Sequence, residues 1–195
     1  ESQRRISNLL IPELLELIDE NVYFNILKIR DSSGQTYLHT ICELDDAAHL
    51  LKQIIKPLKC DRSATGEVPE SERSDCRLKE ILSLKSSRGE TILHSVVGSL
   101  QDLSLLYQDI RHEDRPYIQS IMTSLITVVE TLEPKDRAAM LMVGDSKGET
   151  VMHKLNYSID EHIVSLLDKI PAGDRAKLLE ADSLDGNTPK HIMCS

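Results

Sequence analysis

Four histidines close one recurring phrase of this chain, and their type and spacing make them its strongest candidates for chemistry. In each copy a threonine stands two residues after a glycine, and the histidine follows three residues later. An imidazole can act as a general acid or base near neutral pH, and several imidazoles together can bind a transition metal. The threonine–histidine pairs are Thr36 and His39, Thr91 and His94, Thr150 and His153, and Thr188 and His191.

The distribution of the four copies argues against a shared metal site. Their glycines are Gly34, Gly89, Gly148 and Gly186, so each histidine belongs to a separate unit. A turn followed by a helix start, repeated along a chain, is typical of a solenoid of stacked units. Packed helices lie about 8–10 Å apart, whereas zinc ligands lie about 2 Å from one ion. We therefore predict structural histidines, with no metal or other cofactor.

The rest of the chain shows no enzyme motif. It contains no P-loop, no GxSxG nucleophile turn, no HExxH and no Cys/His zinc spacing. An acidic group at Glu43, Asp45 and Asp46 is more typical of helix capping than of catalysis. We expect that the protein is not an enzyme.

The recurring phrase resembles the T-P-L-H-x-A hallmark of the ankyrin repeat family, although only Thr188-Pro189 keeps the proline. The resemblance implies an all-α fold: an ankyrin-type solenoid of helical repeats with short turns or hairpins. The copies are spaced more widely than the family's period of about 33 residues, which indicates insertions between units. The resemblance also implies that threonine caps the first helix and that histidine bonds to turn backbone groups within or between units.

Helical periodicity and repetition predict further elements. Apolar residues recur at helical spacing from about Asp114 to Leu132, which predicts one long helix. The stretch Asp136–Leu141 recurs as Asp174–Leu179, each preceded by a proline, which predicts an additional helix before the third and fourth turns. A broad apolar pattern over Asn8–Glu20 predicts a helix that either caps the first unit or belongs to an incomplete earlier unit.

These elements make one expected domain over residues 1–195. Residues 59–76 are rich in Ser, Glu, Arg, Gly and Pro, and we expect a flexible insertion there, either a plain loop or a phosphorylated one. The expected divisions are capping helices at 1–30, unit 1 at 31–58, the insertion at 59–76, unit 2 with its own insertion at 77–132, unit 3 at 133–170 and a partial unit 4 at 171–195.

Composition limits the classes of partner. The chain has 23 Lys plus Arg against 32 Asp plus Glu, a net charge of −9. That balance argues against direct nucleic-acid binding and permits a protein partner with a basic segment. No apolar run reaches the roughly 18 residues of a membrane span.

The four cysteines form no CxxC pair, which favours reduced thiols in an intracellular protein. A Cys60–Cys76 disulfide is the alternative. We expect a cytoplasmic protein, also possible in the nucleus, and leave its oligomeric state open.

The resemblance implies a non-catalytic protein–protein interaction module that binds through turn tips and the exposed face of each first helix. The candidate contacts differ between copies: Gln35, Arg88, Glu90, Lys147 and Glu149. The alternative is that these are only solvated turn residues. A further resemblance to the IκB branch implies a signalling adaptor or regulator. Two other interpretations are an ankyrin-repeat effector from a microbe or parasite and the recruiting domain of a larger enzyme.

Overall fold

The structure is a computed structural model that describes residues 18–42, 47–55, 58, 77–98, 115–155 and 160–194. In these ranges the chain is helical, and its only β contacts are isolated bridges between Arg30 and Thr36 and between Lys85 and Thr91. The all-α prediction is confirmed at this level. The helices are α2 (Glu20–Leu27), α3 (Tyr37–Ile41), α4 (Ala47–Ile55), α7 (Arg115–Thr131), α8 (Pro134–Leu141), α9 (Val151–Lys154), α10 (Asp160–Leu167), α11 (Ala172–Glu180) and α12 (Pro189–Cys194), and residues 77–82 and 92–98 are also helical.

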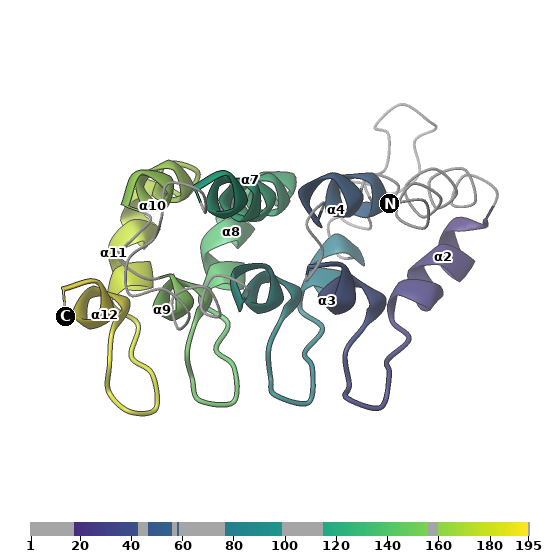
Figure 1. Ribbon diagram of the computed structural model, residues 1–195, viewed down its shortest axis with the longest axis horizontal. Coiled ribbons are helices and arrows are strands. Elements are labelled where there is room, and N and C mark those ends of the chain that lie inside the picture. Colours follow the sequence, from purple (N-terminus) through teal and green to yellow (C-terminus); the bar gives the residue numbers. More distant parts are fainter. Residues whose placement is uncertain are drawn as a thin grey trace.

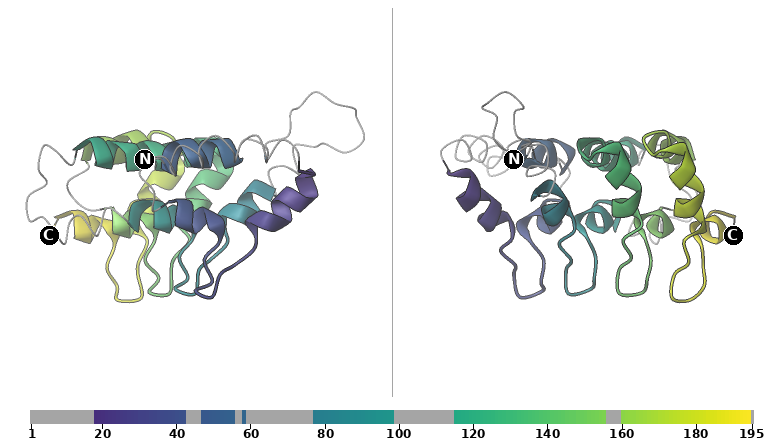
Figure 2. Two further views of the ribbon diagram at one scale, coloured as in Figure 1. Left: turned by 45° about the vertical axis from the view of Figure 1, so that its right-hand side comes forward. Right: turned by 180° about the vertical axis from the view of Figure 1, so that it is seen from behind.

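The helices lie in an elongated array that follows the sequence from one end to the other (Figure 1). Helices α4, α7 and α10 form one row, and α3, residues 92–98, α9 and α12 form the opposite row. Helices α8 and α11 cross between the rows and lead into the turns. Four loops project side by side from the second row, and the views of Figure 2 show the same row of loops on one side of the array.

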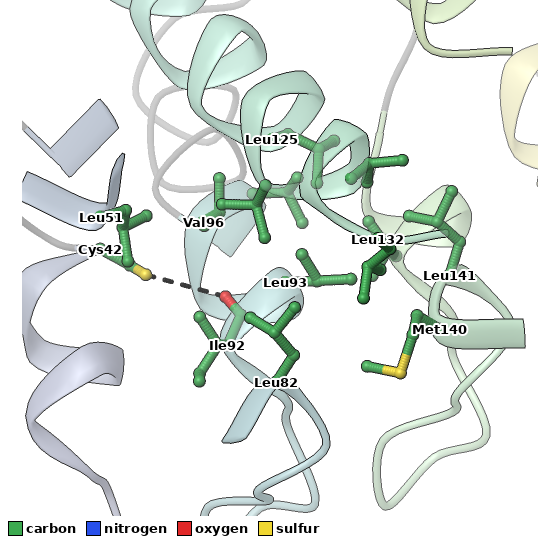
Figure 3. Packing of buried hydrophobic residues seen from close by; sticks show 14 of the residues in the cluster. Cys42, Leu51, Leu82, Ile92, Leu93, Val96, Leu125, Leu132, Met140 and Leu141 are labelled. Carbon is green, nitrogen blue, oxygen red and sulfur yellow. Dashed lines mark hydrogen bonds between the residues drawn. The ribbon is translucent and has the colours of Figure 1, made fainter. Parts of the chain in front are cut away.

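The core lies between the two rows. The apolar stripe expected on the long helix is buried along α7, and Met122, Leu125 and Val129 are fully enclosed. Figure 3 shows Leu93 and Val96 directed toward Leu125 and Leu132 of this region. Burying each such side chain contributes roughly 1.5–3 kcal/mol. The helices are short, so this shared core, rather than helix propensity, holds them in place.

The predicted additional helices are present as α8 and α11. Pro134 is the first residue of α8, where its missing N–H costs no helical hydrogen bond, and Pro171 is the N-cap of α11. The repetition extends to side-chain hydrogen bonds. Nε of Arg137 donates to the carbonyl of Leu132, and Nε of Arg175 donates to that of Ile170, each at 3.0 Å. The two helices are therefore equivalent elements of neighbouring units.

Several expectations fall outside the described residues. They are the capping helix up to residue 17, the acidic group at Glu43, Asp45 and Asp46, the insertion at 59–76 and a Cys60–Cys76 disulfide. Of the capping helices expected at 1–30, the described residues contain α2, where the Asp19 carboxylate accepts from the N–H groups of Asn21 and Val22.

Candidate functional site: the stacked turns

Each projecting loop is a tight turn closed by the same two backbone hydrogen bonds. In the first, the Gly34 N–H donates to the Asp31 carbonyl at 3.0 Å, and the Asp31 N–H donates to the Gln35 carbonyl at 2.9 Å. The glycine has φ of 72°, in the left-handed region where a side chain is strained. The same pair of bonds recurs around Gly89, Gly148 and Gly186, which have φ of 74°, 72° and 74°.

The residue that begins each turn supports it with its side chain. Oδ1 of Asp31 accepts from the Ser33 hydroxyl at 2.7 Å and from the Gln35 N–H at 2.9 Å. The hydrogen bond from Ser33 is the main reason that the pKa of Asp31 is lowered. Asp145 accepts from the backbone in the same way in the third turn, and Ser86 and Ser183 stand at this place in the other two. Asp and Ser suit this position because they can bond to backbone two residues on.

The threonine–histidine pair joins each turn to the helix after it. The Thr36 N–H donates to Nδ1 of His39 at 3.2 Å, and the Thr36 hydroxyl lies 2.8 Å from the same nitrogen. A backbone amide can only donate, so Nδ1 is unprotonated and the imidazole proton is on Nε2. The same Nδ1 contact recurs in the other three copies. The threonine hydroxyl completes a reciprocal capping box at Thr36 and Thr150, which confirms the predicted helix cap.

The protonated Nε2 of each of the first three histidines bonds to the following turn. His39 donates to the Glu90 carbonyl at 3.1 Å, and His94 donates to the Glu149 carbonyl at 2.9 Å. His153 donates to the Asn187 carbonyl at 2.9 Å. This confirms the expected bonding to turn backbone groups, here within and between units. Burial is the main reason that the pKa values of His39 and His94 are lowered, which favours the neutral ring that this pattern requires.

The turns also contact one another through the main chain. The Ser87 N–H donates to the Ser33 carbonyl at 3.2 Å, and the next two junctions repeat the bond, from Ser146 to Arg88 and from Leu184 to Lys147. The approach is close enough that a Cβ on Gly89 would lie 2.7 Å from the Ser146 nitrogen. A Cβ on Gly186 would meet nothing within 4 Å. At the inner junctions glycine is therefore required for two reasons. Its φ would strain any side chain, and the next turn leaves no space for a Cβ.

A buried group of charges crosses the junction between the second and third turns. Nζ of Lys154 lies 3.0 Å from Oε1 of Glu90 and 3.1 Å from Oδ2 of Asp145. The exposed fractions of the Lys154 and Asp145 side chains are 7% and 5%. Burial disfavours the Lys154 ammonium, but the two carboxylates outweigh it and raise its pKa. For Asp145, burial acts against ionisation, but hydrogen bonds from the Lys147 N–H and Lys154 lower its pKa.

The sequence did not predict this charge group. One signal was present, because the residue after the histidine is Thr40, Ser95, Lys154 or Ile192 in the four copies. A lysine directly after a buried histidine is expected to be buried itself. A buried lysine is in turn expected to have an oppositely charged partner.

The five predicted contact residues all lie on the turn edge, which is the side of the array formed by the four projecting loops. They differ in how exposed their side chains are. Arg88 and Lys147 are exposed at the tips, and Gln35 and Glu149 are half-buried. The Glu90 side chain is only 15% exposed, and its two oxygens bond to Lys154 and Arg88. Glu90 therefore belongs to the charge group that joins two units.

The structure also locates residues considered for other chemistry. Within the described ranges, no three His, Cys, Asp or Glu side chains gather as a metal site requires. Cys42 is buried, and its thiol donates to the carbonyl of Leu38 at 3.0 Å. None of the described helices combines the length and apolar character needed to cross a bilayer.

Comparison with protein-family models, with curated proteins and with solved structures finds no match for this chain.

Proposed function

We propose that this chain is a protein-binding module of the ankyrin-repeat type, whose turn edge contacts a protein partner. The observation that carries the proposal is the threefold recurrence of one junction. His39, His94 and His153 each accept from their own turn through Nδ1 and donate to the next turn through Nε2. Equivalent bonds at each junction support a solenoid of equivalent units, and solenoids present extended binding surfaces.

The turn edge suits recognition because its frame is constant and its tips vary. Glycine, threonine and histidine serve the frame in all copies, so the residues between them are free to differ. The exposed residue before each glycine is Ser33, Arg88, Lys147 or Asp185. Tyr37, whose exposed fraction is 46%, adds an aromatic side chain at the start of the first helix of its unit.

The charge of the tips refines the kind of partner. Arg88 and Lys147 place two cations on the edge, and they suit carboxylates of the partner. A partner with a basic segment is expected from the net charge of −9. Because Glu90 is already paired with Lys154 and Arg88, the acidic residues left for that partner are Glu149 and the exposed Asp185. Both kinds of contact weaken as salt concentration rises.

In the cell we propose a non-catalytic, cofactor-free adaptor or IκB-like regulator in the cytoplasm or nucleus, without direct contact to nucleic acid. The resemblance of the repeated phrase supports this role. The two alternatives, an ankyrin-repeat effector and the recruiting domain of a larger enzyme, use the same turn edge and differ in the partner that it binds.

The test is capture of partners from native extract by three forms of the chain, with mass spectrometry of the bound proteins. The first is the wild type, and the second carries Arg88→Ser and Lys147→Ser, which copy Ser33 at the equivalent position of the first turn. The third carries Lys52→Gln and Lys135→Gln, which make the same change in net charge on exposed sites of α4 and α8, away from the turns.

We expect a protein that the wild type and the α4/α8 variant retain and the turn variant loses. Equal retention by all three forms would place the interface away from the turn tips. Retention that needs a catalytic co-substrate in the extract would favour the recruiting domain of an enzyme.

A further inference from the structure

The second and third turns are inner members of the row of loops, with a described turn on each side (Figure 2). The Ser87 N–H bonds to the Ser33 carbonyl on one side, and the Lys147 carbonyl accepts from the Leu184 N–H on the other. The residues directly before the two glycines are Arg88 and Lys147, and both are exposed. We call these two residues the tip pair.

The guanidinium of Arg88 is held in place but leaves most of its donors available. Its Nε lies 3.0 Å from Oε2 of Glu90, and the exposed fraction of the Arg88 side chain is 71%. Oε1 of the same carboxylate lies 3.0 Å from Nζ of the buried Lys154. Among the described residues no other group bonds to the guanidinium, so Nη1 and Nη2 can donate together to one carboxylate. The buried charge group therefore orients a cation toward solvent.

The neighbouring turn repeats this set of groups. Nζ of Lys147 bonds to nothing within the described ranges. Each member of the tip pair follows an exposed serine, Ser87 or Ser146, whose hydroxyl is likewise unpaired in those ranges. Two adjacent turns thus each offer a cation and a hydroxyl donor.

The charges of the turns favour an anionic ligand. The first three turns carry four cationic side chains and four carboxylates, counted over residues 30–36, 85–91 and 144–150. The net charge of −9 therefore arises outside these turns. Three of the four carboxylates are already bonded to turn N–H groups or to cations, and they are Asp31, Glu90 and Asp145. The fourth, Glu149, is half-buried, so an anion that approaches the tips meets the exposed cations first.

The spacing of the tip pair fits one kind of backbone. The Ser146 N–H donates to the Arg88 carbonyl at 3.1 Å. Residues paired in this way have Cα atoms about 5 Å apart, and Lys147 is one residue further on, so the Cα atoms of the tip pair are about 9 Å apart or less. In a polyproline II segment every third side chain returns to the same face after about 9 Å. Its backbone carbonyls make no internal hydrogen bonds, so they can accept from serine hydroxyls.

We propose that the tip pair binds an acidic segment of a protein partner in the polyproline II conformation, with two carboxylate side chains three residues apart. One carboxylate accepts from Nη1 and Nη2 of Arg88, and the other pairs with Nζ of Lys147. The hydroxyls of Ser87 and Ser146 donate to carbonyls of the segment between them. The contact rests on the proposed function, because it takes the turn edge as the binding surface, and it selects an acidic partner over a basic one.

Short proline-rich synthetic peptides test the contact without a native partner. The first has two glutamates three positions apart, and the second has the same composition with the glutamates adjacent. The third and fourth replace both glutamates of the first by glutamine or by lysine. Each peptide is titrated into the wild-type chain, and binding is followed by the NMR signals of the backbone amides.

The first peptide should shift the amide signals of the second and third turns. The glutamine peptide should bind about tenfold more weakly or worse, because it lacks the charges that the tip pair recognises. The peptide with adjacent glutamates should bind severalfold more weakly, and binding of the first peptide should fall as salt concentration rises. Equal affinity of the first and third peptides, or tighter binding of the lysine peptide, would overturn the acidic contact. Equal affinity of the first two peptides would overturn the polyproline II register.

Matched variants of the chain locate the binding. Arg88→Ser with Lys147→Ser should weaken binding of the first peptide about tenfold or more. Lys52→Gln with Lys135→Gln makes the same change in net charge on α4 and α8 and should bind it like the wild type. Amide signals outside the turns that match those of the wild type show that both variants are folded. Equal weakening in both variants, or in neither, would refute the tip pair as the site.

Failure of this contact is distinguishable from failure of the proposed function. If the turn variant still loses a protein from native extract while the glutamate peptide does not bind, the acidic contact is refuted and the turn edge remains the interface. If the extract shows no protein that depends on the tips, the proposed function fails by its own test.

Discussion

Nε2 of His94 lies 2.9 Å from the carbonyl oxygen of Glu149, although 55 residues of chain separate them. The other ring nitrogen of His94 accepts from the Thr91 N–H at 3.2 Å. One neutral imidazole therefore holds its own turn and the next turn together. The ring is fully buried, so neither bond can be replaced by water when it is lost.

This arrangement predicts unequal effects of removing equivalent histidines. His94→Ala should lower the free energy of unfolding by about 1–3 kcal/mol, because it leaves the buried Thr91 amide without its acceptor and removes one of the two donors to the Glu149 carbonyl. His191→Ala should cost less, because His191 is exposed and its Nε2 has no partner among the described residues. Urea denaturation of both variants measures the difference. Equal losses would contradict the bridging role assigned to His94.

Glycine substitutions should separate the effect of backbone conformation from that of close approach. Gly89→Ala and Gly186→Ala share a φ of 74°, so both carry the strain of roughly 1 kcal/mol that a side chain meets in this region. Gly89→Ala adds a clash with the Ser146 nitrogen at 2.7 Å, whereas Gly186→Ala has open space. Thermal melting should therefore show a clearly larger loss for Gly89→Ala, and a larger loss for Gly186→Ala would refute the stacking of turns.

The buried charge group should be most sensitive to loss of its cation. Lys154→Met leaves the carboxylates of Glu90 and Asp145 facing each other, and breaking such a buried pair costs about 3–5 kcal/mol. Adding Glu90→Gln and Asp145→Asn to Lys154→Met removes the uncompensated charges and should restore part of that loss. Denaturant curves of the single and triple variants test this. A triple variant less stable than the single one would show that the carboxylates stabilise the fold without Lys154.

Stability should fall as the solution is acidified below neutral pH. The pKa values of His39 and His94 are lowered in the folded protein, chiefly by burial, so the unfolded chain binds more protons as pH falls. Their contribution is fully present above the unfolded value of about 6.5 and is lost as pH falls through the lower folded values. Denaturation at a series of pH values between about 7.5 and 5.5 measures the slope.

The matched control for the pH series is the double variant His39→Gln, His94→Gln. A glutamine amide can accept and donate without titrating in this range. The double variant should therefore show a shallower dependence of stability on pH than the wild type. Equal slopes would assign the effect to other groups.

Local sequence patterns were sufficient to predict the helices and the glycine, threonine and histidine residues that form each turn. The apolar spacing predicted α7 to within a residue at each end, because a helical stripe is set by neighbours three and four positions away. The repeated prolines likewise predicted α8 and α11. The bonds between Thr36 and His39 span three residues, so the local sequence is enough to specify the contact between the histidine and its own turn.

The tertiary structure alone decided which groups meet across units. Nothing local to Glu90 shows that its carboxylate bonds to Lys154, 64 residues away, and this contact makes a candidate partner residue an internal one. The histidines meet carbonyls 51, 55 and 34 residues away, and these distances differ because the insertions between units differ. Contacts of this kind depend on how the packed core brings distant turns side by side, whereas the turns themselves are specified by the few residues that form them.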